Sequence, residues 1–161
     1  MALYIKQGDL LTADVDYICH QVNCQGKMNS GIAKSIREKW PIVYENYFEK
    51  CYALKNMSQL LLGDIQIVGL WEDYYPTPIH KSVINMFSQE HYGYDKRRYT
   101  SYDAFWNCLN LIKLNIQKGS KIGFPGNIGC CRGGANWNVI LEMIKEVLAE
   151  DFEVYIYFLE D

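Results

Sequence analysis

The chain alternates short, apolar, β-rich runs with longer stretches of helical spacing, and this alternation limits the folds that it can adopt. Strands are expected at residues 2–7, 16–23, 63–70, 82–87, 121–125 and 152–160, and helices at 31–40, 41–55, 101–117 and 136–150. Strands that are apolar along their length are suited to burial on both faces of a sheet. The pattern therefore predicts an α/β fold, with a mixed, mostly parallel sheet between two layers of helices.

The first two expected strands are joined only by the short segment GDLLTADV, residues 8–15. This segment is too short for an ordinary crossover helix between parallel neighbours. Two arrangements stay open at this point. The two strands are an antiparallel pair, or they are joined by a short turn.

Length and composition are those of one globular domain over residues 1–161. The formal net charge of −3 disfavours a nucleic-acid partner, and the basic run at 96–98 is more typical of a solvated loop. The sequence lacks a membrane-length apolar stretch and the basic start of a signal peptide, so a cytoplasmic protein without a membrane partner is expected. The six Cys form no CxxC pair and only three His are present, so neither a metal nor a cofactor is expected.

Two loops that follow apolar strands and lead into helices are rich in Gly and small residues. They cover residues 23–33 and 126–137. Gly lets backbone N–H groups approach a ligand closely, and a helix N-terminus adds free N–H groups and a partial positive charge. Two such loops facing each other at the carboxyl ends of the strands would hold a diphosphate. Neither loop matches the P-loop or the dinucleotide fingerprint. The alternative is that these Gly residues only turn the chain.

Four segments together resemble the macrodomain family: residues 8–11, 18–33, 84–105 and 123–137. More narrowly, they are similar to the compact bacterial and phage type that processes ADP-ribose-1″-phosphate. The resemblance implies a three-layer α/β/α sandwich with a mixed six-stranded sheet. It also implies a cleft for ADP-ribose or a derivative at the strand ends.

The resemblance also assigns roles in the cleft. Asp9 would accept a hydrogen bond from the adenine amino group, and Asn23 would bind the distal ribose. Residues 30–33 and 128–133 would form the two diphosphate loops, and Trp137 or the aromatic residues of 155–158 would supply a surface for adenine. The predicted ligand-binding residues are Asp9, Leu10, Asn23, Ser30, Gly31, Ile32, Ala33, Gln89, Pro125, Ile128, Gly129, Cys130, Cys131, Arg132, Gly133 and Trp137.

Each assignment has a plainer alternative. Asp9 is equally typical of a turn or a helix cap, and Asn23 of a strand end that bonds its own turn. Cys131 stands where many relatives carry Gly, which puts a positive φ in doubt there and could narrow the cleft. Arg132 could contact a phosphate or point to water.

Candidate catalytic residues are harder to place. Relatives that hydrolyse ADP-ribosyl bonds use a Lys and an Asp, and the matching positions here are Gln89 and Gly133. A Gln can neither form an imine nor act as a base near neutral pH. Release of a 1″-phosphate needs only a positioned water and an acid or base. The candidates are His20, Asn23 and His91, the last of them on a loop at 90–98 that could cover the distal ribose.

Four functional hypotheses follow. The first is an enzyme that binds ADP-ribose and hydrolyses a 1″ substituent, above all the phosphate of ADP-ribose-1″-phosphate. The second is a reader of ADP-ribose or of ADP-ribosylated protein, without turnover. The third is a hydrolase that removes ADP-ribosyl groups from protein or nucleic acid. The fourth is a scaffold whose cleft binds nothing.

Overall fold

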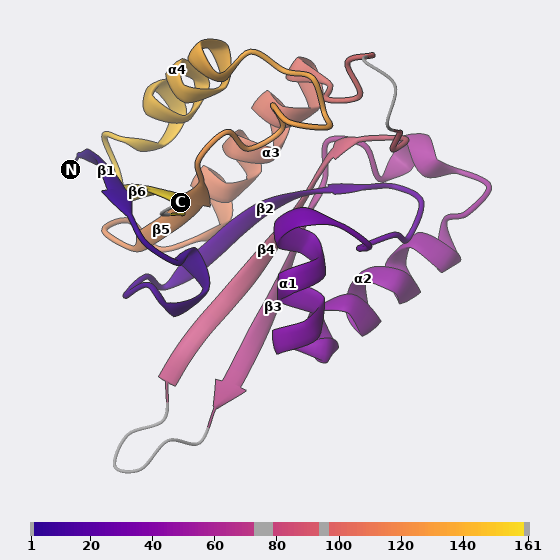
Figure 1. Cartoon of the computed structure of the whole chain (residues 1–161), viewed down its shortest axis with the longest axis horizontal. Helices are drawn as coiled ribbons and strands as arrows, with labels where there is room; N and C mark the ends of the chain where they lie inside the picture. Colours follow the sequence, from indigo (N-terminus) through magenta and orange to yellow (C-terminus); the bar gives the residue numbers. More distant parts are fainter. Residues whose placement is uncertain (1, 73–78, 94–96, 160–161) are drawn as a thin grey trace.

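The computed structural model describes residues 2–72, 79–93 and 97–159. Six strands and four α-helices follow one another in a largely alternating order (Figure 1). The strands are β1 (Leu3–Gln7), β2 (Tyr17–Asn23), β3 (Ile65–Glu72), β4 (Ile79–Gln89), β5 (Lys121–Pro125) and β6 (Glu153–Phe158). The helices are α1 (Gly31–Lys39), α2 (Pro41–Ala53), α3 (Tyr102–Asn115) and α4 (Trp137–Leu148), with short 3₁₀ turns η1 (Leu10–Thr12) and η2 (Ser58–Leu60). Every expected strand and helix is present, with ends within a few residues of those predicted.

The strands form one six-stranded sheet in the order β1-β6-β5-β2-β4-β3. All neighbouring pairs are parallel except β3 and β4, which are antiparallel at one edge. The predicted mixed, mostly parallel six-stranded sheet is confirmed. Because five parallel strands point the same way, their carboxyl ends lie along one edge of the sheet.

The possibility that the first two strands pair in antiparallel fashion is wrong. β1 lies at the edge beside β6, while β2 lies at the centre between β5 and β4. The short connection passes over β5 at Gly123, where a side chain would collide with Leu10 and Val15. A Gly at this point therefore lets nine residues, 8–16, which include the 3₁₀ turn η1, replace a crossover helix.

Helices cover both faces of the sheet, as predicted for a three-layer α/β/α sandwich (Figure 1). On one face, Ile36, Val43 and Tyr47 of α1 and α2 pack on apolar side chains of β2, β3 and β4. On the other face, α3 and α4 bury a second apolar cluster that includes Phe105 and Ile144. Within the described part of the chain, no helix has the length and apolarity needed to cross a membrane.

Two helix starts agree with the capping chemistry expected from the sequence. Pro41 is the first residue of α2, a position where its missing N–H costs nothing. The Ser101 side chain accepts a hydrogen bond from the N–H of Ala104 at 3.1 Å and so caps α3. These caps fix where the segments before α2 and α3 end.

Candidate functional site

A cleft of about 920 Å³ opens at the carboxyl ends of the parallel strands. This volume lies in the range of sites that bury a cofactor-sized ligand. Both glycine-rich loops line the same cleft, together with the start of the η1 segment and the end of β6. Predicted residues in its lining are Asp9, Leu10, Asn23, Ser30, Gly31, Ile32, Ala33, Gln89, Pro125, Ile128, Gly129, Cys131, Arg132 and Gly133. The structure therefore brings together segments that lie more than a hundred residues apart in the sequence.

The first loop is shaped by the Asn23 side chain. Its Oδ1 accepts from the Gln25 N–H at 2.9 Å and from the Tyr47 hydroxyl at 2.8 Å, and its Nδ2 donates to the Lys27 carbonyl at 2.9 Å. The same Tyr47 hydroxyl donates to the Asn23 carbonyl at 2.7 Å. Asn23 thus folds the turn that follows its own strand, and one amide hydrogen is left for a ligand.

The first loop ends at the N-terminus of α1. Ser30 precedes the helix and makes no side-chain capping bond, so the first N–H groups of α1 face the cleft without an internal partner. Gly31 has a φ of +58°, in the left-handed region that favours glycine. A helix end of this kind offers backbone donors and a partial positive charge to an anion.

The second loop is held by left-handed residues at Asn127, Gly129 and Gly134, with φ values of 62°, 75° and 71°. Cys131 is not among the positive-φ positions. A side chain at that position therefore causes no backbone strain. The backbone of Cys131 does not need the positive φ that a Gly there would favour. Cys131 is exposed and lines the cleft beside Arg132.

Gly133 has no room for any side chain. A Cβ there would collide with the Thr100 hydroxyl and the Gly129 carbonyl, and would lie 3.0 Å from Nε2 of Gln21. The position that the sequence resemblance matches to an Asp is therefore closed to larger residues by the packing of this chain. The absence of an acid here is part of the architecture of the loop.

A half-buried amide, Gln21, joins the second loop to the central strands. Its Oε1 accepts from the Ser88 hydroxyl at 2.6 Å, and its Nε2 donates to Oε1 of Gln89 at 2.6 Å and to the Thr100 hydroxyl at 2.9 Å. Thr100 in turn donates to the Gly129 carbonyl at 2.8 Å. We call Gln21, Ser88, Gln89 and Thr100 the amide hub. Two of its members, Gln21 and Gln89, line the cleft, and Gln89 pairs with Asn23 across the sheet.

Sequence reasoning did not single out Gln21. It lies in the middle of an expected strand and matches no motif, so its role depends on the neighbours that the sheet brings to it. Lys27, Asn29 and Tyr92 also line the cleft, although none was among the predicted ligand-binding residues. Lys27 and Asn29 belong to the predicted loop at 23–33, and Tyr92 belongs to the loop at 90–98 that was expected to cover the distal ribose.

The opposite end of the cleft is formed by Asp9 and two aromatic residues of β6. Asp9 caps η1, where its Oδ1 accepts from the Leu11 N–H at 2.9 Å, and it also lines the cleft. Asp9 therefore caps η1 and also lines the cleft, so the two roles considered for it do not exclude each other. Tyr157 and Phe158 supply the aromatic wall.

Trp137 and Cys130 lie outside the cleft lining, contrary to expectation. Trp137 begins α4 and packs edge-on against the Phe158 ring at 5.9 Å, so it supports the aromatic wall from behind. The Cys130 side chain packs against the apolar core, and burial raises the pKa of its thiol to about 11. Neither side chain is placed to contact a ligand in the cleft.

The two predicted catalytic His residues also lie outside the cleft lining. His20 is fully buried in β2 and its Nε2 lies 2.6 Å from Oδ1 of Asn85. Burial lowers the pKa of His20 to about 4 although the Asn85 bond acts in the opposite direction, so the ring is neutral near pH 7. His91 is largely exposed and lies 3.7 Å from Oε1 of Glu90. Their positions do not support the catalytic roles expected for them.

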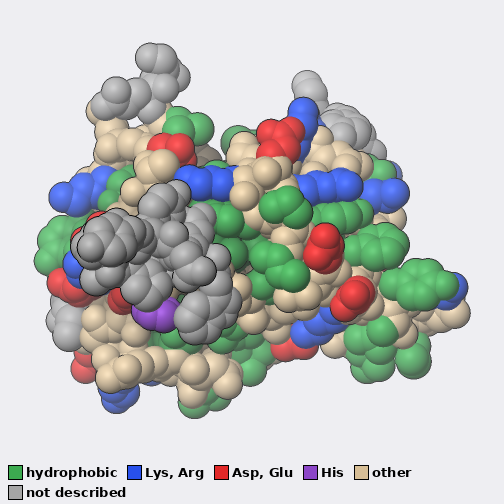
Figure 2. All heavy atoms as spheres, turned by 90° about the horizontal axis from the view of Figure 1, so that it is seen from below, with side chains coloured by type: hydrophobic (Ala, Val, Ile, Leu, Met, Phe, Trp, Pro, Cys, Tyr) green, Lys and Arg blue, Asp and Glu red, His purple; other side chains and the backbone are tan. Residues whose placement is uncertain are grey.

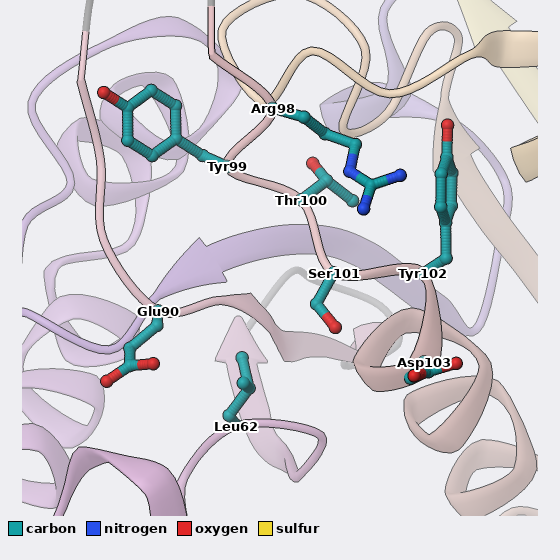
Figure 3. Close-up of a pocket in the computed structure, with 8 residues that line it drawn as sticks. All are labelled: Leu62, Glu90, Arg98, Tyr99, Thr100, Ser101, Tyr102 and Asp103. Atoms are coloured by element: carbon teal, nitrogen blue, oxygen red, sulfur yellow. The ribbon is translucent and has the colours of Figure 1, made fainter.

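A second, smaller hollow of about 400 Å³ lies on the far side of Thr100 (Figure 3). Glu90 and Asp103 line it, and the Arg98 guanidinium stacks over the Tyr102 ring at 4.5 Å. Two carboxylates make this hollow a poor place for a phosphate. No predicted site residue lines it, and we assign the ligand to the larger cleft.

Comparison with known proteins identifies the fold. The macrodomain of Thermus aquaticus DarG superposes with a TM-score of 0.72 at 23% identity, and the alignment covers 96% of this chain and 97% of that one. The chain has the macrodomain fold. Thermosipho africanus DarTG in complex with ADP-ribose has a TM-score of 0.77 at 19% identity, covering 98% of this chain and 41% of that one.

Sequence comparison adds curated relatives. A DNA ADP-ribosyl glycohydrolase of Thermus aquaticus is 25% identical over 158 residues, which is 96% of this chain and 41% of the relative. The macrodomain-like chain thus spans about two fifths of the curated glycohydrolases that it matches. No protein-family model matches the chain.

Proposed function

We propose that the cleft binds the ADP-ribosyl group of ADP-ribose or of a derivative. The observation that carries this proposal is that two glycine-rich loops, one of which ends at the N-terminus of α1, line one cleft of about 920 Å³. The diphosphate lies between the N-terminus of α1 and the loop at 128–133. Adenine lies against Phe158 beside Asp9, and the distal ribose lies near Asn23. A solved relative of the same fold carries ADP-ribose, which supports this choice of ligand.

Thermal unfolding tests the binding step. A ligand at about a hundred times its Kd adds roughly 2.7 kcal/mol to the stability of a folded protein. For a chain of this size that corresponds to a rise in Tm of about 5–10 °C. ADP-ribose should produce this rise, whereas AMP, which lacks the distal ribose and one phosphate, should produce much less. Equal rises in Tm with ADP-ribose and with AMP would contradict the proposal that the two loops clamp a diphosphate.

A second candidate function is hydrolysis of the bond at the 1″ position. The fold shared with relatives named DNA ADP-ribosyl glycohydrolases favours it. The amide hub can orient a water molecule there, but amides cannot take up its proton. Lys27 and Tyr92 are the titratable side chains of the lining near that end, and they are our candidates for proton transfer. The 1″-phosphate is the leaving group that the sequence resemblance selects.

Turnover separates an enzyme from a reader. Purified chain at high concentration is incubated with ADP-ribose-1″-phosphate and, separately, with ADP-ribosylated thymidine oligonucleotide and ADP-ribosylated protein. Release of phosphate or of free ADP-ribose identifies the substrate. Binding of ADP-ribose without any release would establish the reader and refute the second candidate.

A further inference from the structure

One layer of the sandwich carries a net positive charge, unlike the chain as a whole. Residues 24–57 comprise the first glycine loop, α1, α2 and the turn after α2. They contain six Lys or Arg against three Glu, a net charge of +3, in a chain whose overall charge is −3. The whole-chain charge, which led us to expect no nucleic-acid partner, hides this difference. A polyanion is attracted by the local field of a surface and can approach this layer.

An aromatic ladder runs along the outer side of α2 within this basic layer. Tyr44, Phe48 and Tyr52 are spaced four residues apart, so they lie on one side of the helix. Their ring centroids are 5.9 Å and 6.1 Å apart in sequence order. Phe48 is 45% exposed and Tyr52 is 61% exposed. Large aromatic side chains exposed in a row are unusual on a surface that contacts only water.

A cation lies at each end of the ladder. The Arg37 guanidinium lies 3.6 Å from the centroid of the Tyr44 ring, and the Lys55 ammonium lies 4.6 Å from that of Tyr52. Figure 2 shows this side of the molecule, where hydrophobic side chains protrude over α2 with Lys and Arg close by and acidic side chains among them. Glu45 and Glu49 of α2 are exposed as well. They restrict bound phosphates to the two cationic ends.

The ladder begins at the wall of the cleft. Nη1 of Arg37 donates to Oδ1 of Asn29 at 3.2 Å, and Asn29 lines the cleft. The Tyr44 hydroxyl donates to the Gly26 carbonyl at 3.1 Å, in the loop that Asn23 shapes. A polymer lying on α2 would therefore reach the first glycine loop without leaving the surface.

We propose that the strip formed by Arg37, Tyr44, Phe48, Tyr52 and Lys55 binds single-stranded nucleic acid. Unpaired bases stack on exposed aromatic rings, and the two cations contact phosphates. A duplex hides the faces of its bases and gains only the phosphate contacts. This surface goes beyond the proposed function, because it acts on the polymer and needs no ADP-ribose. Together with the cleft, it would hold a nucleic acid that carries an ADP-ribosyl group.

Fluorescence anisotropy with a labelled oligothymidine of about ten nucleotides tests the strip. We expect binding that weakens with salt and that is tighter than for a duplex of the same length. Tyr52→Ala and Phe48→Ala should each weaken it by at least about fivefold, as loss of a stacking residue does elsewhere. Lys55→Glu should weaken it and reduce the salt dependence. Trp106→Ala, which removes a 41% exposed aromatic side chain from α3, and Lys118→Glu are the matched controls and should change nothing.

Three results would overturn the proposal. They are no binding at low salt, equal losses in the strip variants and the controls, and a duplex that binds as tightly as the single strand. A change of oligomeric state in Tyr52→Ala would instead identify the strip as a protein interface. The ADP-ribose titration of each variant is measured separately. Intact ADP-ribose binding with lost oligonucleotide binding would then locate the effect on the strip.

Discussion

At the scale of single residues, the shape of the site depends on two kinds of position. At one kind there is no space for a side chain, and at the other the side chain is hydrogen-bonded to its own loop. Gly133 is closed to any Cβ by Thr100 and by the Gly129 carbonyl. Asn23 uses most of its amide to fold its own loop. Both residues therefore act on a ligand mainly through the backbone that they shape.

Gly133→Ala should weaken ADP-ribose binding, because the added methyl group pushes the second loop away from the amide hub. Overpacking of this kind costs about 1–3 kcal/mol of stability. Gly69→Ala is the control, since a Cβ at Gly69 meets nothing within 4 Å. ADP-ribose affinity is measured by calorimetry and folding by circular dichroism. Unchanged affinity in a folded Gly133→Ala protein would contradict the close contact described here.

His20 should make the protein less stable in acid. Its pKa is about 4 in the folded chain and 6.5 when exposed, so only the unfolded chain binds the proton between these values. Stability is therefore full above about pH 6.5 and falls as the pH drops toward 4. Because one pH unit of pKa difference corresponds to about 1.4 kcal/mol, the loss amounts to about 3 kcal/mol.

Urea unfolding at several pH values checks this expectation. His20→Gln keeps a donor for Asn85 and should flatten the pH dependence over that window. His91→Gln, at an exposed position, should leave the profile of the wild type unchanged. Identical profiles for the wild type and His20→Gln would show that His20 does not set the acid limit.

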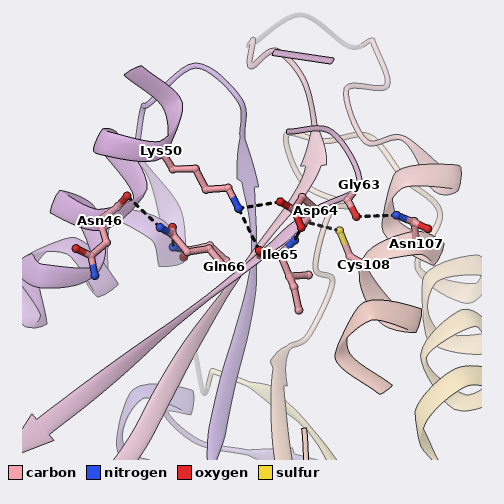
Figure 4. Close-up of polar contacts among 9 residues, drawn as sticks. Asn46, Lys50, Gly63, Asp64, Ile65, Gln66, Asn107 and Cys108 are labelled. Carbon is pink, nitrogen blue, oxygen red and sulfur yellow. Dashed lines mark hydrogen bonds and ion pairs between the residues drawn. The ribbon is translucent and has the colours of Figure 1, made fainter. Parts of the chain in front are cut away.

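At the scale of elements, polar contacts tie the sheet to the helices of both layers. Figure 4 shows one such group at the start of β3, where the turn before the strand is held from both helical layers. Nζ of Lys50 on α2 lies 2.8 Å from Oδ2 of Asp64. On the other side, Nδ2 of Asn107 on α3 donates to the Gly63 carbonyl at 3.0 Å.

Lys50→Met should destabilise the fold by about 1 kcal/mol, near the upper limit for pairs that are partly exposed. The exposed fractions of the Lys50 and Asp64 side chains are 26% and 42%. Lys34→Met is the matched control, because the Lys34–Glu38 pair is longer, at 4.0 Å, and more exposed. It should have almost no effect. Equal losses of unfolding free energy in the two variants, measured by chemical denaturation, would mean that the Lys50–Asp64 contact stabilises the fold no more than the Lys34–Glu38 pair does.

At the cleft, the amide hub joins strands β2 and β4 to the second loop. Gln21→Leu leaves Ser88, Gln89 and Thr100 without their shared partner, at a cost of about 1–3 kcal/mol. ADP-ribose affinity should fall because Thr100 no longer fixes the second loop. Gln66→Leu breaks a comparable bond to Asn85, 3.0 Å long and outside the cleft lining, and so tests stability alone. If Gln21→Leu and Gln66→Leu bind ADP-ribose equally well, the amide hub has no role in ligand binding.

At the scale of the whole molecule, periodicity and loop composition predicted the elements, the mixed sheet and the two loops that line the cleft. Strand order could not be read in the same way, because β1 pairs with β6 from the far end of the chain. The prediction for His20 failed because it used closeness to Asn23 in sequence. His20 packs with Asn85 inside the sheet, and the register shifts between Val22 and Asn23.

Trp137 shows the same limit at the adenine end. An aromatic residue type at position 137 predicts a surface for adenine. The packing of the folded chain decides that Phe158 lines the cleft and that Trp137 packs against Phe158. The charge of the chain is a further case. Its sum is −3, while the layer of α1 and α2 is basic. Interaction surfaces depend on this distribution, which becomes visible only when the layers are known.

Isothermal titration calorimetry of the wild-type chain with ADP-ribose shows whether the two glycine loops clamp a diphosphate in one cleft. We expect binding of one ADP-ribose per chain, with AMP and ribose 5-phosphate each binding far more weakly, because neither spans both loops. Absence of heat at high ligand concentration, or AMP binding as tightly as ADP-ribose, would contradict it.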